Sequence, residues 1–470
     1  MRVAFYQELW TDQAGPLLLA EILEQKGHEV RFVLAGKGWE KTMAEFSPHV
    51  AAFSVYTGSH LSQLAAARRV KETCSPAPLV VLGGPHPTFY PEVLKDPMVD
   101  AACAGEAETA FPAFLEAIES GSLEKGVENF AVKHQGRVIR RPMAPLVRDL
   151  DALPIPRREA LYNHYPLLAK APFMRICAGR GCPYSCSYCF NGAFRRMTRG
   201  LGPYIRRRSP ENVLEEMAYL SREYGMKHAI FNDDVFTLDR GWLEAFAREK
   251  GRLARKVTYD ISTCARFLSG EVVRLLAGSG CRMVCMGVEV ADERFRQEVL
   301  KKPGTNREIL DAAERLHAAG IGIQTYNMVG FPGQTLEQAL DTVRLNREIR
   351  PFYAWCSIAT PYPGTELSAY WARQYGSGET DLPQLANPSY FQASALPGEE
   401  AAAATNLQKF FALLVRFPFL EPLVLRLIKR PANRGFHAVY QAVYGLHMMR
   451  RLKAGPAYAL ALYRRLRGHF

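Results

Sequence analysis

The chain has 470 residues, of which 48% are apolar and 23% are charged, and its net charge at pH 7 is +12. This length and composition indicate a globular protein of two or three domains, because one ordinary domain is shorter. The ten cysteines are scattered apart from one cluster, which argues against a secreted disulfide framework and favours a reducing compartment. The N-terminal residues contain no long apolar stretch, so no signal peptide is expected and the predicted location is cytoplasmic.

The first 133 residues alternate short apolar runs of β type with amphipathic helical segments. The β-type runs cover residues 3–6, 29–34, 50–55 and 79–82, and the helical segments lie near residues 17–26, 61–73 and 111–118. This alternation predicts an α/β domain with a doubly wound, Rossmann-like parallel sheet. Ligands of such a sheet bind at the carboxyl ends of its strands.

Glycines and small polar residues gather where three of these strands end. Glycine allows the backbone to approach a bulky ligand closely, so these loops are the candidate binding site of the first domain. The candidate residues are Ser54, Thr57, Gly58, Ser59, Gly83, Gly84, Pro85, His86, Gly105 and Glu106, with His60 beside them. A generic nucleotide-binding loop is the alternative interpretation of these glycines.

Residues 134–170 are predicted to be a linker, because prolines as close together as Pro154 and Pro156 exclude regular helix. In residues 171–375 a strand followed by a helix recurs about six times, which predicts a partial (β/α)6 barrel of the TIM type. The active-site residues of such a barrel lie at the C-terminal ends of its strands. Residues 376–470 are expected to form a mainly helical, basic domain.

Three cysteines follow the first predicted strand of the barrel with the spacing CxxxCxxC. Cys182, Cys186 and Cys189 supply three thiolates, whereas a [4Fe–4S] cluster normally takes four. One iron is therefore left for another ligand. Zinc binding and simple core packing are the competing interpretations, although zinc sites come as paired CxxC elements or Cys/His sets. Cys177, Cys281 and Cys285 are expected to pack in the core.

Polar side chains also follow three later strands of the predicted barrel. Asp233 and Asp234 come after residues 228–231, and Arg266 and Glu289 come at the ends of the next two strands. A carboxylate accepts a hydrogen bond from an ammonium group, and a guanidinium binds a carboxylate with two hydrogen bonds. A surface ion pair is the alternative interpretation for Arg266 or Glu289 taken singly.

The segment 181–190, including the aromatic Tyr188 before the last cysteine, resembles the signature of radical S-adenosylmethionine (SAM) enzymes. The glycine loops upstream resemble the cobalamin (B12)-binding domain that precedes the barrel in one large subfamily. This resemblance implies a [4Fe–4S] cluster on the three cysteines, with SAM on the open iron, and cobalamin as a further cofactor. It also implies that the acidic pair meets the SAM amino group, that Arg266 meets its carboxylate or the substrate, and that Glu289 meets its ribose or amine.

One loop departs from the pattern of many cobalamin domains. Residues 10–16, after the first strand, contain no histidine, whereas many such domains place their lower axial cobalt ligand there. If cobalamin binds, its cobalt is expected to lack a histidine ligand on that face. Axial ligation is one way in which a protein tunes a metal, and its loss should ease transfer of a methyl group as a radical.

The resemblance implies an enzyme that cleaves SAM reductively and methylates an unactivated carbon of a small-molecule substrate. Its electrons would come from an external donor such as flavodoxin or ferredoxin. A cyclase or rearrangement enzyme with the same cofactors, as in anaerobic tetrapyrrole synthesis, is the first alternative. A cobalamin-binding regulatory protein with a structural cluster is the second. The sequence does not specify the substrate.

The C-terminal region combines apolar runs with a strong positive charge. Residues 401–470 carry twelve Lys and Arg side chains against one acid, Glu421, so the preceding residues are almost neutral. The apolar run 410–428 is interrupted by Arg416, Pro418 and Pro422, which excludes a membrane-spanning helix. A helical cap packed on the barrel is predicted. Peripheral contact with an anionic inner membrane surface, or with a lipid-like substrate, is the alternative, and no nucleic acid partner is expected.

Overall fold

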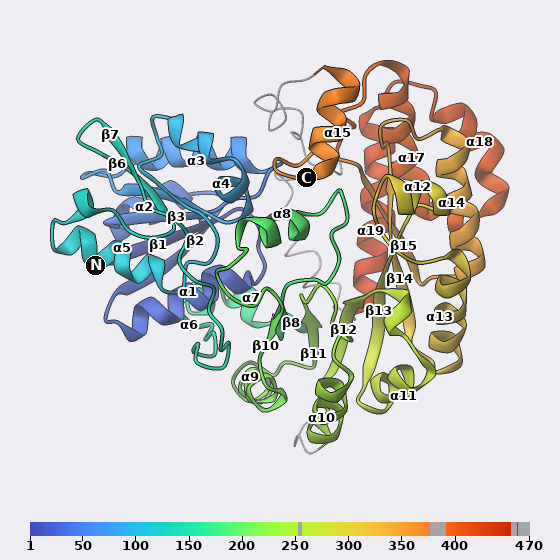
Figure 1. Ribbon diagram of the computed structural model, residues 1–470, viewed down its shortest axis with the longest axis horizontal. Helices are drawn as coiled ribbons and strands as arrows, with labels where there is room; N and C mark the ends of the chain where they lie inside the picture. The colour runs from blue at the N-terminus through green and yellow to red at the C-terminus, as the bar shows by residue number, and fades with distance from the viewer. Residues whose placement is uncertain (252–255, 377–391, 453–457, 459–470) are drawn as a thin grey trace. The chain divides into compact units, whose positions relative to one another are not determined.

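The computed structural model describes residues 1–251, 256–376, 392–452 and 458 (Figure 1). The described residues fall into two compact units. The first contains Met1–Ala171 and Phe194–Arg206, and the second contains Pro172–Ala193 and the described part of Arg207–Gly455. The stretch 134–170 therefore packs with the first unit, whereas the domain boundaries given by the sequence stay predictions.

A seven-stranded sheet forms the centre of the first unit, in the order β2-β1-β3-β4-β5-β6-β7. The strands are β1 (Arg2–Gln7), β2 (Glu29–Leu34), β3 (Val50–Ser54), β4 (Leu79–Gly83), β5 (Ala101–Cys103), β6 (Phe130–His134) and β7 (Arg137–Arg140). The first five are parallel, and their apolar runs are almost fully buried. Buried continuous runs are typical of a parallel sheet covered on both faces. The predicted doubly wound sheet is confirmed.

The helices of this unit alternate with its strands. They are α1 (Ala14–Gln25), α2 (Trp39–Phe46), α3 (His60–Thr73), α4 (Pro85–Phe89), η1 (Pro91–Lys95), α5 (Ala110–Glu119), η2 (Leu123–Lys125), α6 (Glu159–Tyr162) and α7 (Pro166–Ala169). Since β2 and β3 flank β1 on opposite sides, the strand order reverses at β1 and β3. The carboxyl ends of β1 and β3 therefore border the crevice in which doubly wound sheets bind ligands.

The hairpin of β6 and β7 was not predicted from the sequence. His134 pairs with Arg137, and the two residues between them, Gln135 and Gly136, have φ values of 47° and 76°. Two positive φ angles define the tight turn that best fits twisted antiparallel strands. Glutamine is not a usual residue of such turns, so the local sequence gave little sign of the hairpin.

The second unit is built on six parallel strands in the order β15-β14-β13-β12-β11-β8. These strands are β8 (Phe173–Ile176), β11 (His228–Phe231), β12 (Thr258–Thr263), β13 (Cys281–Glu289), β14 (Gly322–Val329) and β15 (Tyr353–Ile358), and two short strands, β9 (Gly179–Arg180) and β10 (Arg206–Arg207), lie outside this sheet. Six parallel strands in sequential order are the predicted partial barrel, which is confirmed.

Helices follow the strands of the half-barrel in turn. They are α8 (Phe190–Met197), α9 (Pro210–Tyr224), α10 (Arg240–Lys250), η3 (Ala265–Phe267), α11 (Gly270–Gly278), α12 (Glu293–Glu298), α13 (Asn306–Ala318), α14 (Leu336–Ile349) and α15 (Glu366–Tyr375). Seven of them begin with a side-chain N-cap, an oxygen that accepts a backbone N–H of the first turn. The caps are Ser209, Asp239, Ser269, Asp292, Thr305, Thr335 and Thr365. Each cap marks the residue at which a loop ends and a helix begins, so the local sequence helps to define these loops.

Three further helices and a short turn complete the described residues: α17 (Gly398–Arg416), η4 (Pro418–Leu420), α18 (Glu421–Leu427) and α19 (Arg434–Leu452). Phe410, Phe411 and Leu414 of α17 are buried in one core with Val329 of β14 and Ala354 of β15. The predicted helical cap on the barrel is confirmed for these helices. In the described part of the chain no helix is both long and apolar enough to cross a membrane. The basic residues Lys453, Arg464, Arg465 and Arg467 lie outside the described residues.

Helix α19 places one arginine among the strands of the half-barrel. The Arg451 guanidinium donates from Nε to Asp260 Oδ2 at 2.8 Å and from Nη1 to Gln324 Oε1 at 2.7 Å. His228 Nε2 lies 3.1 Å from Asp260 Oδ1. Burial favours a raised pKa for Asp260, but the hydrogen bond from His228 and the charge of Arg451 outweigh it and lower that pKa. Arg451 and Asp260 therefore form a buried ion pair that joins α19 to the sheet.

Candidate active site

The three predicted cluster cysteines lie together in the loop between β9 and α8. All three are partly exposed, and none forms a disulfide. The Cys189 backbone N–H donates to Cys186 O at 3.0 Å. Ser187 anchors the loop, since its N–H donates to Leu300 O at 2.9 Å and its hydroxyl donates to Val299 O at 2.7 Å. The loop is therefore held against the segment that follows α12.

The thiols of this loop are close enough to affect one another electrostatically. Burial raises the pKa of Cys182 to about 12 and that of Cys186 to about 11, and the charge of Cys189 adds to both. Among the described residues, no group of three His, Cys, Asp or Glu side chains is placed to hold one metal ion. In a four-iron cluster each thiolate bonds its own iron.

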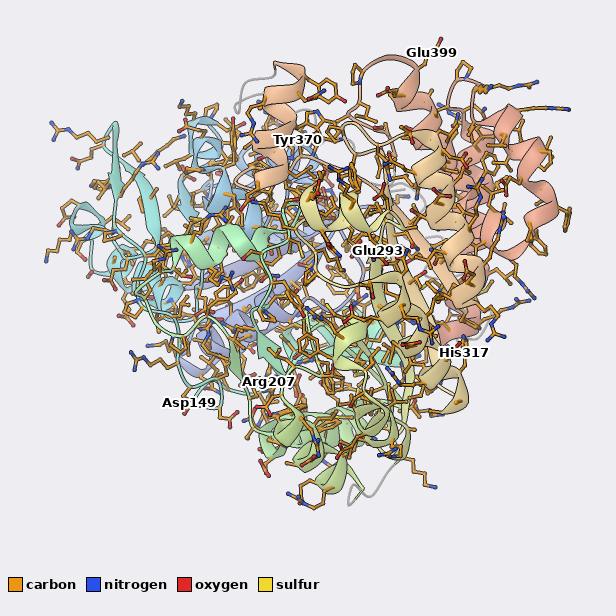
Figure 2. The ribbon with its side chains drawn as sticks, turned by 45° about the vertical axis from the view of Figure 1, so that its right-hand side comes forward. Asp149, Arg207, Glu293, His317, Tyr370 and Glu399 are labelled. Carbon is orange, nitrogen blue, oxygen red and sulfur yellow. The ribbon has the colours of Figure 1, made fainter. Side chains whose placement is uncertain are left out.

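The two predicted acidic residues after β11 lie in different surroundings. Asp233 is buried, and its Oδ2 accepts the Ala178 backbone N–H at 2.9 Å. Burial raises the pKa of Asp233 to about 6, against that hydrogen bond and the charge of Arg207. Arg207, labelled in Figure 2, donates to the carbonyls of the residues just after this acidic pair. Asp233 thus joins the end of β8 to the end of β11.

Asp234 is exposed and faces the cysteine loop through an amide. Asn191 Nδ2 lies 3.1 Å from Asp234 Oδ2 and 3.4 Å from Cys189 Sγ. The structure therefore places Asp234, rather than Asp233, on the side of the cluster cysteines. Asn191 was not predicted as a site residue, because nothing in its local sequence distinguishes it. The SAM contacts of both aspartates stay predictions.

Glu289 ends β13 in an unusual backbone conformation. Its φ of 63° is rare for a non-glycine residue, and such residues cluster at functional sites. Its buried carboxylate accepts Lys302 Nζ at 2.7 Å. Burial, and next the charge of Glu289, raise the pKa of the Tyr188 hydroxyl. A Cβ on Gly287 would meet Lys302 Nζ and Glu289 Oε1, so a side chain there would displace this ion pair.

A small pocket that opens to solvent lies beside this ion pair. It is lined by Cys264, Arg266, Gly287, Arg296, Lys302 and Glu308, among others. The Arg266 guanidinium lies 3.7 Å from Glu308. The surface ion pair considered from the sequence is thus present, and the same arginine lines the pocket. Arg296 and Lys302 are two further cations of the lining, both buried. Sequence reasoning missed them, because neither lies in a recognisable motif.

In the first unit, the loops after β3 and β4 are pressed together. The Val55 N–H donates to Gly83 O at 2.7 Å, and the His86 N–H donates to Val55 O at 2.9 Å. Gly84 has φ of 95°, and a Cβ there would lie 2.9 Å from Val55 O. The predicted residues lie in these two loops, at the strand ends before them and in the first turn of α4: Ser54, Thr57, Gly58, Ser59, Gly83, Gly84, Pro85 and His86.

Two histidines of these loops stack on each other with ring centroids 4.4 Å apart. Thr57 Oγ1 lies 2.8 Å from His86 Nδ1, and the Gly58 N–H donates to His60 Nδ1 at 3.2 Å. Burial lowers the pKa of His60 to about 4 and that of His86 to about 3, so both are neutral at pH 7. Within the described residues the Nε2 atoms of both are buried without a hydrogen-bond partner. Such atoms are rare without a ligand to satisfy them.

The two predicted residues after β5, Gly105 and Glu106, form hydrogen bonds to neighbouring loops. The Gly105 N–H donates to Thr88 Oγ1 at 3.0 Å. The Glu106 carboxylate accepts from Arg206 at 2.7 and 2.9 Å and from the Val147 N–H at 3.0 Å. Glu106 is thus committed to a buried ion pair, and its contact with a cofactor stays a prediction.

Comparison with known families identifies both units. Residues 176–345 match the radical SAM superfamily, and residues 11–115 match the B12 binding domain. This chain carries a radical SAM domain and a B12-binding domain. The recognition made from the cysteine and glycine motifs is confirmed.

Similar proteins include several methyltransferases and a cyclase. An uncharacterized methyltransferase of Pyrococcus horikoshii is 29% identical, over 76% of this chain and 77% of its own. The cytidylyl-2-hydroxyethylphosphonate methyltransferase of Streptomyces wedmorensis is 22% identical, over 73% of this chain and 70% of that protein. The anaerobic magnesium-protoporphyrin IX monomethyl ester cyclase of Cereibacter sphaeroides is 27% identical, over 69% of this chain and 53% of that protein. Among solved structures, the radical SAM methyltransferase TsrM of Kitasatospora setae shares the fold, with a TM-score of 0.67, 17% identity and coverage of 79% and 75%.

The cofactors of this radical SAM enzyme are a [4Fe–4S] cluster, SAM and cobalamin. The described side chains fit these groups. Three thiols outside any disulfide suit a cluster with one open iron, and the cationic pocket beside them suits a carboxylate. The open space where a Cβ of Gly83 would lie and the unpartnered Nε2 atoms of His60 and His86 suit a large polar ligand.

Replacing Gly84 by alanine is expected to lower the affinity for cobalamin by about tenfold, because the positive φ and the close Val55 backbone strain the loop. Equilibrium dialysis with hydroxocobalamin would measure this change. Gly121→Ala is the matched control, since Gly121 also has a positive φ but lies after α5, outside the two loops, and a Cβ there would have nothing within 4 Å. Equal affinities of the two variants, at equal thermal stability, would show that this loop does not form the cobalamin site.

Proposed function

We propose that this radical SAM enzyme is a cobalamin-dependent methyltransferase that acts on an unactivated carbon of a small-molecule substrate. The observation that carries the proposal is the presence in one chain of both sites, the three-cysteine loop beside a cationic pocket and the glycine loops of the B12-binding unit. Two of the similar proteins are named methyltransferases, which supports transfer of a methyl group.

When bound, the cluster and cobalamin supply electron transfer to SAM and a carrier for its methyl group. The residues of this chain position these groups. Cys182, Cys186 and Cys189 hold three irons, and Asn191 donates a hydrogen bond to one of these sulfurs. This charge-assisted bond to a thiolate would keep the loop fixed when the charge of the cluster changes.

The pocket beside the cluster loop would hold the methionine end of SAM. Arg266, Arg296 and Lys302 are the cations that line it, so the carboxylate of SAM would meet at least one of them. Glu289 would accept from the amine or the ribose, held in place by Lys302. Asp234, next to the loop through Asn191, is the other acceptor for the amine.

This function implies an electron donor and a substrate. Electrons would come from flavodoxin or ferredoxin, and the substrate would be a small molecule, with a lipid-like one among the alternatives. The cytoplasm stays the predicted location. Contact with a membrane would depend on the C-terminal helices and not on the catalytic site.

The second candidate is a cyclase or rearrangement enzyme with the same cofactors. Its support is the likeness to the magnesium-protoporphyrin cyclase, which this chain matches over 53% of the length of that protein. The cyclase would use the same cysteines and pocket, but no methyl group would leave SAM.

An assay of the first methyl transfer separates the two without knowledge of the substrate. The reconstituted enzyme would be incubated anaerobically with hydroxocobalamin, a reductant and SAM carrying a labelled methyl group. We expect S-adenosylhomocysteine in the reaction and the label in the corrinoid, as seen by mass spectrometry. Formation of 5′-deoxyadenosine without any S-adenosylhomocysteine would contradict methyl transfer and favour the cyclase.

A further inference from the structure

The segment 416–430, which contains η4 and α18, exposes three large apolar side chains. Phe417 is 41% exposed, Phe419 is 76% exposed and Leu423 is 53% exposed. Single exposed apolar residues are common, but three within seven positions form a patch, and such patches mark contact sites. We call these three residues and the basic side chains Arg416, Arg426, Lys429 and Arg430 the α18 patch.

Packing within the protein does not account for these exposed side chains. Val424 and Ile428, four residues apart and so on one face of the segment, are buried against Phe411 and Leu414 of α17. Leu423 lies on another face, which the described residues leave exposed. In Figure 1, α18 lies at the outer side of α17, away from the strands. The segment therefore has a second apolar face beyond the one that builds the core.

Four of the five charged side chains of the segment 416–430 are positive. Arg416, Arg426, Lys429 and Arg430 are exposed, and no salt bridge involves them among the residues that the structure describes. The single acid of the segment, Glu421, is engaged with the barrel side, since its Oε2 lies 2.7 Å from Arg347 Nη2. Nothing in the segment therefore neutralises the four cations at the patch.

We infer that the α18 patch binds the surface of an anionic phospholipid membrane. Exposed aromatic and leucine side chains insert at the level of the headgroups, and flanking Lys and Arg attract anionic lipid. A protein partner would need a shaped pocket for the protruding Phe419 and acidic residues for four separate cations, whereas a fluid anionic bilayer supplies both. This membrane contact is separate from the proposed methyl transfer.

Binding of the full-length protein to extruded vesicles, followed by sedimentation, tests the inference. We expect binding to vesicles of phosphatidylcholine with 30% phosphatidylglycerol, and at least tenfold weaker binding to pure phosphatidylcholine. Phe419→Ser with Leu423→Ser should lower the partition coefficient by about tenfold, and Arg426→Glu with Lys429→Glu by about as much. Higher salt should weaken binding of the protein, as it screens the charges.

Matched controls come from β7 of the first unit. Val138→Ser removes an apolar side chain that is 48% exposed, and Arg137→Glu with Arg140→Glu reverses two exposed cations. These variants should bind vesicles as the original protein does. Binding that survives both α18 double substitutions would overturn the inference, as would equal binding to neutral vesicles. A change in oligomeric state with no change in vesicle binding would assign the patch to a protein partner instead.

Discussion

Cys186→Ala is expected to reduce the cleavage of SAM by more than a hundredfold, because only two thiolates then remain for the cluster. Loss of a group that merely supports a metal ligand already costs about 10- to 100-fold in affinity or activity, and a ligand should cost more. The measurement is 5′-deoxyadenosine formed under reducing, anaerobic conditions, together with the iron content and the electron paramagnetic resonance spectrum of the reduced protein. The spectrum reports the cluster even if the substrate is absent.

Cys177→Ala is the control for this variant. Cys177 lies at the end of β8, close to the loop, but its thiol donates to the Gly179 carbonyl at 3.1 Å. The Cys177→Ala variant should therefore keep its iron content and its activity in SAM cleavage. A full cluster in Cys186→Ala, or the loss of the cluster in Cys177→Ala alone, would contradict the assignment of the three ligands.

Arg451→Met is expected to lower the free energy of unfolding by about 3–5 kcal/mol, since removing one partner leaves the buried Asp260 carboxylate uncompensated. Arg451 also binds Gln324, so β12 and β14 both lose a hydrogen bond to α19. Urea unfolding followed by circular dichroism would measure the change. The double substitution Asp260→Asn with Arg451→Met should be less destabilised than Arg451→Met, because no unpaired charge is then buried.

Arg450→Met is the matched control, since Arg450 is the preceding residue of the same helix and is exposed. Its effect should lie within about 0.5 kcal/mol of the original protein. Equal stabilities of the two single variants would mean that Arg451 does not join α19 to the barrel.

The sequence predicted what depends on neighbouring residues. Apolar residues recur with one period in a strand and another in a helix. Both sheets and the helices after the barrel strands were therefore expected in order. The cluster loop was found because its three cysteines lie within eight residues, and their spacing is itself the signal. The glycine loops after β3 and β4 were found in the same way.

The residues around these motifs were decided by the tertiary structure. Lys302 pairs with Glu289 and Asn191 connects Asp234 to Cys189, but each contact joins different loops and has no local pattern. Burial separates the two aspartates that look alike in the sequence, since only Asp233 is enclosed between β8 and β11. Such roles depend on which strand ends become neighbours in the sheet.

The C-terminal region shows most clearly which properties follow from the sequence and which follow only from the tertiary structure. The sequence by itself determined that residues 401–470 are helical in pattern and strongly basic. It did not separate the arginine that is buried with Asp260 from those that are exposed at the α18 patch. Arg451 and Asp260 are 191 residues apart, so their pairing exists only once α19 packs on the half-barrel. Charge and periodicity are properties of the chain, whereas burial and pairing are properties of the fold.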